Sequence, residues 1–185
     1  MPNLGIIASS ISGNLATNSF ESIATITPYT TTSTVVFSSI PSTYKHLQIR
    51  FIGRTDRANQ EDNIQLRFNS DSAGNYAAHV LYGDGATASS FSDGSSITFN
   101  TRSVVAAASA TSGVFGVGVI DILDYADTNK YKTVRDLFGY DFNGSGRVGM
   151  NSMGYNTTSA VTSLSLTGRT WGQYSSFALY GIRGN

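Results

Sequence analysis

The sequence predicts an all-β fold, an antiparallel β-sandwich of jelly-roll-like architecture with an extended N-terminal arm. Short runs that alternate apolar and polar residues recur along the chain, and Gly, Pro, Asn, Asp and Ser separate them. No stretch carries the apolar spacing of an amphipathic helix. At 185 residues the chain fits one domain and is long enough to bury a sizeable core.

The central stretch Val114–Tyr140 predicts a long antiparallel hairpin. Two β-favouring runs, Val114–Leu123 and Tyr131–Tyr140, flank the polar loop Asp124–Lys130. Apolar residues of the first run change parity, from Phe115, Val117 and Val119 to Ile120 and Ile122. The change indicates burial on both faces or a bulge. Gly116 and Gly118 leave room there for a neighbouring aromatic ring or backbone.

Other alternating runs predict further strands, namely Ser22–Thr27, Thr34–Phe37, His46–Arg54, Asn63–Phe68, Tyr76–Tyr82, Val148–Tyr155, Ala160–Thr167 and Ser176–Ile182. Gly83–Ser96 is predicted to be a small-residue loop, followed by a short edge strand at Ile97–Phe99. The Ala content of Arg102–Gly113 permits a helix, but its Ser, Thr and Val residues favour a strand or loop. The residues predicted to be buried are Leu47, Ile49, Leu66, Phe68, Val119, Ile122, Leu164, Phe177 and Leu179.

We predict that residues 1–20 form the arm and residues 21–185 form a single sandwich domain. The arm carries Leu4, Ile6, Ile7, Ile11 and Leu15 among Gly, Ser and Asn, with a spacing that matches neither a helix nor a strand. Two interpretations stay open. The segment either pairs with its own domain or docks on another subunit, in which case a homo-oligomer, with a trimer favoured, follows.

The composition excludes several classes of partner. Formal net charge is zero and the pI is about 6.7, so no basic field favours nucleic acid or an anionic membrane. Charged residues are 13% of the chain, about half the usual share, and Ser, Thr, Asn and Gly replace them. Such surfaces are common in large assemblies and outside cells. No apolar run reaches about 18–20 residues, so no membrane insertion is expected, and no Lys or Arg precedes the first apolar stretch as in a signal peptide.

No motif predicts catalysis. His46 and His79 lie in predicted strands without a ligand-spaced partner, and no G-x-S-x-G sequence is present. Asp121 and Asp136 could face each other across the central hairpin, where a structural role is favoured over acid–base work. The absence of cysteine excludes thiolate sites and disulfides. We therefore expect no enzyme activity and no cofactor.

Two weak ligand patterns have structural alternatives. Asp141, Asn143 and Ser145 match the opening of a calcium loop, but position twelve is Ser152 in place of the required Glu. A Gly-rich β-turn is favoured at this place, and Asn69–Gly74 is a similar oxygen-rich turn. The aromatic residues Tyr29, Phe91 and Trp171 could stack on sugar rings, although core packing is the expected role for each.

Four separated segments carry a resemblance to a known family. They are SSIPSTYKHLQIR (Ser38–Arg50), RFNSDSAGNYAAHVLYGDG (Arg67–Gly85), DILDYADTNKYKTVR (Asp121–Arg135) and QYSSFALYGIRG (Gln173–Gly184). Together they resemble a family of bacteriophage virion proteins, which occur in phages of aquatic bacteria as small stand-alone proteins and as modules of tail-fibre-like chains. The resemblance extends from about Ser38 to Gly184.

The resemblance implies a non-enzymatic structural role on the outer surface of a phage particle. A capsid decoration or cement protein is favoured, in contact with the major capsid protein or tail proteins. The alternative is a tail-fibre or receptor-binding module that recognises host surface glycans. No ligand residues come with the resemblance, so the arm residues stay the predicted partner contacts.

Overall fold

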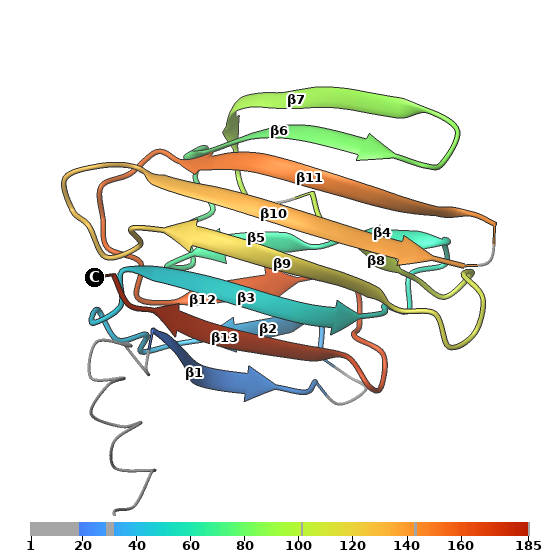
Figure 1. The fold of residues 1–185 in the computed structure, drawn as a ribbon, viewed down its shortest axis with the longest axis horizontal. Coiled ribbons are helices and arrows are strands. Elements are labelled where there is room, and N and C mark those ends of the chain that lie inside the picture. Colours follow the sequence, from blue (N-terminus) through green and yellow to red (C-terminus); the bar gives the residue numbers. More distant parts are fainter. Residues whose placement is uncertain (1–18, 29–31, 101, 143, 185) are drawn as a thin grey trace, which may run out of the picture.

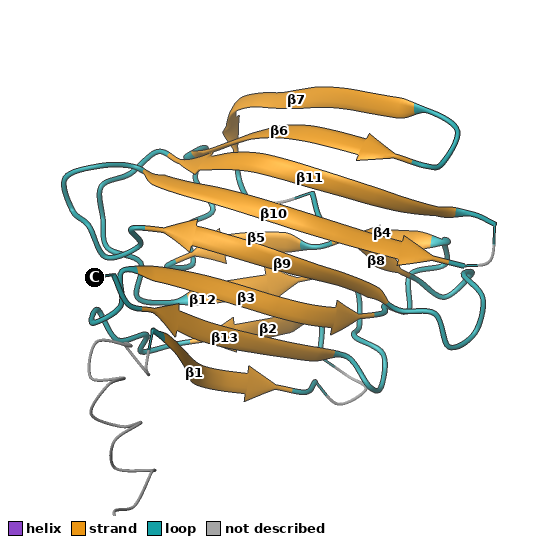
Figure 2. Ribbon diagram, in the orientation of Figure 1, coloured by secondary structure: helices purple, strands orange, loops and turns teal. Residues whose placement is uncertain are grey.

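The fold is an antiparallel β-sandwich, as the sequence predicts, seen in a computed structural model that describes residues 19–28, 32–100, 102–142 and 144–184 (Figures 1 and 2). The predicted arm contacts Leu4, Ile6, Ile7, Ile11 and Leu15 lie outside the described residues. No helix occurs in the described part of the chain, and so none is long and apolar enough to cross a membrane.

The strands follow one another as β1 (Phe20–Ile26), β2 (Thr34–Phe37), β3 (His46–Gly53), β4 (Glu61–Asn63), β5 (Gln65–Phe68), β6 (Tyr76–Gly83), β7 (Ala88–Ile97), β8 (Val104–Ala106), β9 (Gly116–Leu123), β10 (Lys132–Asp141), β11 (Gly146–Tyr155), β12 (Leu164–Thr167) and β13 (Ser176–Ile182). Eight of them form the large sheet, in the order β1-β13-β3-β9-β10-β11-β6-β7. A three-stranded sheet, β2-β12-β5, and a two-stranded sheet, β4-β8, lie behind it in Figure 1.

One face of the large sheet, here the inner face, packs against the two smaller sheets. Alternation along β3 places Leu47, Ile49 and Phe51 on this face, and all three are buried. Leu66 of β5 and Leu166 of β12 belong to the same buried cluster. Each fully buried apolar side chain contributes about 1.5–3 kcal/mol, so these inner rows hold the layers together.

The predicted central hairpin is confirmed. The apolar residues of its first strand change parity because glycines, not apolar side chains, take the first inner positions. β9 and β10 pair from Val117 opposite Gly139 to Leu123 opposite Thr133, without a bulge. Inner positions of β9 are Gly116, Gly118, Ile120 and Ile122. A Cβ at Gly118 would overlap the Phe51 ring, so this glycine accepts the aromatic neighbour that the sequence predicts.

The glycines also explain the error at Val119. This residue was predicted to be buried, but it lies half-buried on the opposite face, since the inner positions on either side of it are Gly118 and Ile120. The other predicted core residues are buried, namely Leu47, Ile49, Leu66, Phe68, Ile122, Leu164, Phe177 and Leu179.

Four predicted segments differ from the structure, one of which, Ala160–Thr167, is a strand only from Leu164 onward (β12). Gly83–Ser96 is not a loop throughout, because β7 occupies Ala88–Ile97, and Ile97 ends this strand instead of beginning a new one. β7 is rich in Ser and is mostly exposed, so its own sequence carries no strand pattern, and pairing with β6 imposes the conformation. Asn63–Phe68 is divided between β4 and β5, which belong to different sheets.

A matched pair of substitutions tests the assignment of the two faces. Leu179→Asp places an unpaired charge in the core and should lower the free energy of unfolding by several kcal/mol. Val119→Asp places the same charge on the outside, opposite Arg50, and should cost about 1 kcal/mol. Urea denaturation of both variants measures the difference. Equal losses of stability would show that the faces are assigned wrongly.

Candidate functional site

The outer face of the large sheet, which points away from the two smaller sheets, carries an apolar patch. Its members are the exposed side chains of Ile52, Leu81, Val117, Leu137, Val148 and Met150, with exposed fractions between 40% and 61%. Single exposed apolar residues are normal, but contiguous patches of roughly 300–600 Å² on a monomer often mark interaction sites. We call these six residues the outer patch.

Strand register makes the outer patch continuous. Ile52 of β3 lies opposite Val117 of β9, and Leu137 of β10 lies opposite Met150 of β11. Met150 in turn lies opposite Leu81 of β6. Cross-strand partners stand about 4.5–5.5 Å apart, so each of these pairs is within contact range. Val119, half-buried on the same face and opposite Leu137, joins the two groups. The outer patch therefore spans the middle of the sheet.

Two hollows flank the centre of the outer patch. One has a volume of about 390 Å³, and its lining includes Leu81, Met150 and the polar residues His79 and Ser152. The other has a volume of about 660 Å³ and lies between Val117, Val148 and the turn that joins β10 to β11. Hollows of this size accept side chains of a partner, which is how buried anchor residues stabilise protein interfaces.

The charged groups beside the outer patch bind one another. Arg135 donates from Nη2 to Asp121 Oδ2 at 3.0 Å, and Gln48 donates from Nε2 to Asp121 Oδ1 at 2.8 Å. Arg50 donates from Nε to Gln48 Oε1 at 2.8 Å, and its guanidinium lies 5.4 Å from the centre of the Tyr180 ring. This polar rim therefore carries two arginines and one carboxylate, a net charge of only +1.

Asp121 and Asp136 do not form a pair, so the idea that they face each other is wrong. Asp121 lies on the outer face, whereas Asp136 points inward and is buried. Asp136 Oδ2 accepts hydrogen bonds from the Ser103 hydroxyl and from Asn151 Nδ2, the latter at 2.7 Å. Successive residues of a strand alternate between faces, and Asp136 lies opposite Ile120, one position before Asp121.

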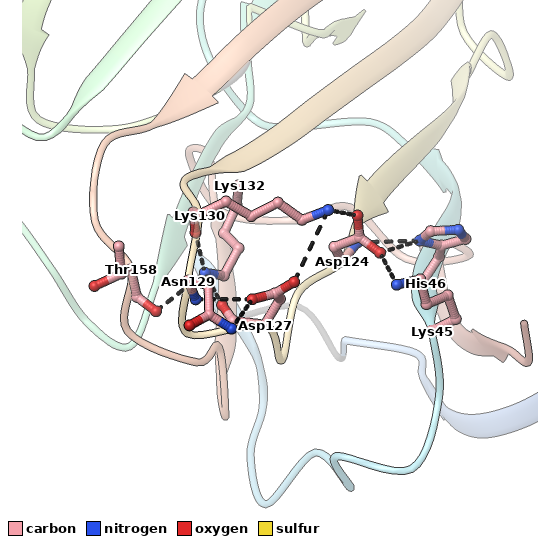
Figure 3. Close-up of polar contacts among 8 residues, drawn as sticks. All are labelled: Lys45, His46, Asp124, Asp127, Asn129, Lys130, Lys132 and Thr158. Atoms are coloured by element: carbon pink, nitrogen blue, oxygen red, sulfur yellow. Dashed lines mark hydrogen bonds and ion pairs between the residues drawn. The ribbon is translucent and has the colours of Figure 1, made fainter.

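The loop of the central hairpin is held by an ionic cluster (Figure 3). Asp124 forms ion pairs with Lys130 and with Lys45, the latter at 2.7 Å. The backbone N–H of Asp124 donates to His46 Nδ1 at 3.0 Å, which fixes this nitrogen as an acceptor. His46 thus has a structural partner, and His79 is exposed on the outer face.

Lys132 supports the same loop from inside. Its side chain is buried, and its ammonium donates to the backbone oxygens of Asp127 at 2.6 Å, Lys130 at 2.9 Å and Thr158 at 3.3 Å. Burial lowers the pKa of Lys132. Three donors meet three acceptors, so the buried charge is satisfied and ties the hairpin loop to the segment that follows β11.

The other residues named above as possible ligand contacts belong to a turn, to the core or to the exposed surface. Of the predicted calcium-loop residues, Asn143 lies outside the described residues, whereas Asp141 ends β10 and Ser145 directly precedes β11. Phe142 N–H donates to Ser145 O at 2.9 Å, and Gly144 has a φ of 97°, as in a hairpin turn. Trp171 is fully buried against Phe177, whereas Phe91 is 43% exposed, and Tyr29 lies outside the described residues. Within the described ranges, no three His, Asp or Glu side chains group as metal ligands would.

The arrangement defines an all-β antiparallel sandwich with an apolar outer face. No family model matches the chain, and no curated protein does. The crystal structure of the Caenorhabditis elegans galectin LEC-6 is similar over 86% of this chain and 96% of that one, at 10% identity and a TM-score of 0.31. A likeness of that degree carries no information on function.

Asp124 predicts a pH dependence of stability. Hydrogen bonds from Lys130 and then Lys45 lower its pKa to about 2 in the folded protein, below the ordinary value of 3.8. A carboxyl group whose pKa is lower in the folded than in the unfolded protein stabilises the fold at pH values above its unfolded-state pKa. This contribution to the free energy of unfolding disappears as the pH falls from about 4 to about 2. Urea denaturation at several pH values should show a smaller acid-induced loss for Asp124→Asn than for the unchanged protein. If both proteins lost the same stability on acidification, Asp124 would not be the group responsible for the pH dependence.

Proposed function

We propose that the chain is a non-enzymatic structural protein of a bacteriophage particle, a decoration protein on the outside of the capsid. The resemblance of its four segments to phage virion proteins supports this role. The observation that carries it is the outer patch, because a capsid surface protein needs an exposed apolar contact area and the outer face supplies one. The proposed occupant of this face is a protein of the shell, since the face is apolar in its middle and its rim carries a net charge of only +1.

Energetics indicate that the outer patch does not act alone. Its side chains are about half exposed, so burying all six contributes on the order of 5–9 kcal/mol gross. Association costs about 4–15 kcal/mol in lost freedom of motion. A second contact or several linked copies must therefore add to it, which is why we keep the arm residues Leu4, Ile6, Ile7, Ile11 and Leu15 and a homo-oligomer in the proposal.

A charge in the centre of the outer patch tests the proposal. Leu137→Glu should abolish binding to particles that lack the protein, because a carboxylate would have to be desolvated at the interface. Val36→Glu is the matched control, since Val36 is 52% exposed on the three-stranded sheet and Leu137 is 56% exposed. Both variants should melt within a few degrees of the unchanged protein. Full occupancy by Leu137→Glu would refute the outer face as the docking surface.

Deletion of residues 1–17 tests the arm separately. The sandwich should keep its melting temperature within a few degrees, since the buried apolar core of the described residues begins at Val35. Binding to particles should fall at least tenfold, because the truncated protein keeps the outer patch but loses the second contact. Occupancy equal to that of the full chain would assign the whole contact to the sandwich.

The alternative function, a tail-fibre or receptor-binding module for host glycans, uses the same fold and the same resemblance. It differs in requiring a site for sugar. Copy number per particle separates the two roles: hundreds of copies indicate decoration, and a handful indicates a tail.

A further inference from the structure

The large sheet extends beyond the sheets that cover it, which opens a cleft at one corner of the sandwich. β6 and β7 lie at the edge of the large sheet, and Figure 1 shows them beyond β4 and β8. The cleft has a volume of about 170 Å³, equivalent to about five or six waters at roughly 30 Å³ each. It lies between the inner face of β6, β7, β10 and β11 and the two-stranded sheet. We call it the corner cleft.

Aromatic rings form one wall of the corner cleft. Phe91 of β7 is 43% exposed, and its ring meets the Tyr82 ring edge to face at 6.3 Å between centres. Phe138 of β10 lies deeper, beneath Gly149, where any Cβ would overlap its ring. The electron-rich face of an aromatic ring attracts groups with positive edge charge, including the C–H bonds of a sugar ring. Phe91 is the ring that a ligand can reach.

Polar groups converge on the same space. Arg147 Nη1 lies 3.1 Å from Glu61 Oε1, and the Tyr140 hydroxyl donates to Glu61 Oε2. The Arg147 guanidinium stacks on Tyr82, 4.4 Å from the ring centre. Burial, followed by the bond to Glu61, raises the pKa of Tyr140, so its hydroxyl stays a donor. The Glu61 carboxylate, an acceptor, is thus held beside the Arg147 guanidinium, a donor.

Two side chains at the mouth of the corner cleft have polar atoms that can still bind a ligand. The other guanidinium nitrogens of Arg147 point to no acceptor within hydrogen-bond distance in the described chain, and the Asn63 side-chain amide has no partner there either. Asn63 is exposed and lines the cleft. A sugar hydroxyl both donates and accepts, so neighbouring hydroxyls can bind Glu61 and Arg147 at once.

From this lining, we propose that the corner cleft binds a neutral hexose unit, with Phe91 stacking on the ring and Glu61, Arg147 and Asn63 binding its hydroxyls. The charges of Glu61 and Arg147 compensate each other, and Arg102, which also lines the cleft, is paired with Asp93. This balance selects a neutral ligand over an anion or a cation. The cleft accommodates one ring and not an extended chain. Its stacking ring, Phe91, lies on the inner face, and Arg147 is the one residue that it shares with the larger hollow beside the outer patch.

Titration of isotope-labelled protein with glucose, galactose and mannose tests the site by amide chemical shifts. At least one hexose should bind with a Kd on the order of millimolar, which is usual for a ligand of this size. The shifted amides should cluster at β4, β7 and the start of β11. N-acetylneuraminic acid, the charged comparison, should bind more weakly.

Variants decide whether the binding belongs to the cleft. Phe91→Ala should weaken binding at least tenfold, and Glu61→Gln, which keeps the shape, should weaken it several-fold. Tyr174→Ala is the control, since Tyr174 is 77% exposed and does not line the cleft. Folding of each variant is checked by its melting temperature. No binding of any hexose up to about 100 mM, preference for the charged sugar, or binding unchanged by both Phe91→Ala and Glu61→Gln would each overturn the proposal.

Discussion

The structure depends on the packing of one face of the large sheet against two sheets that are too small to cover it. Eight strands stand on one side, and three plus two stand on the other. Apolar burial is concentrated where the layers overlap, around Ile49, Ile120 and Leu166, each fully buried. Where the overlap ends, Tyr82 of β6 and Phe91 of β7 are partly exposed on the inner face. The corner cleft is therefore a consequence of unequal sheets.

The same mismatch separates two kinds of surface on the large sheet. Its outer face is apolar in the middle with a hydrogen-bonded polar rim beside it, as a contact surface for protein would be. Its uncovered inner corner combines Phe91 with the Glu61–Arg147 pair, as a site for a small polar ligand would. A protein with both could be held to a particle by one face and contact a sugar with the other.

The sequence predicts those parts of the fold in which side-chain pattern and burial agree. β2 and β13 have the predicted bounds, and the central hairpin is correct, because Val, Ile and aromatic residues alternate with polar ones there. β7 could not be predicted, since its Ser and Gly residues gain strand structure only from pairing with β6. Val119 was misplaced because Gly116 and Gly118 take inner positions that a pattern of apolar residues cannot reveal.

The candidate sites were harder to predict than the fold. The outer patch combines residues of β3, β6, β9, β10 and β11, and their adjacency follows from the strand order, which local patterns do not contain. Phe91 was singled out as a possible sugar-stacking residue, but Trp171, named with it, is buried. Glu61 and Arg147 are distant in the chain, and no motif connects them.

Radical footprinting of the free and particle-bound protein tests the central claim most directly. Met150, which is 47% exposed in the outer patch, oxidises readily in the unbound protein, whereas Met153, three residues further along β11 on the inner face, is 3% exposed and serves as the internal reference. The account predicts that binding to particles protects Met150 and Leu137 strongly while Val36 and Tyr174 keep their rates. Unchanged modification of Met150 on the particle, with protection of Val36 instead, would contradict it.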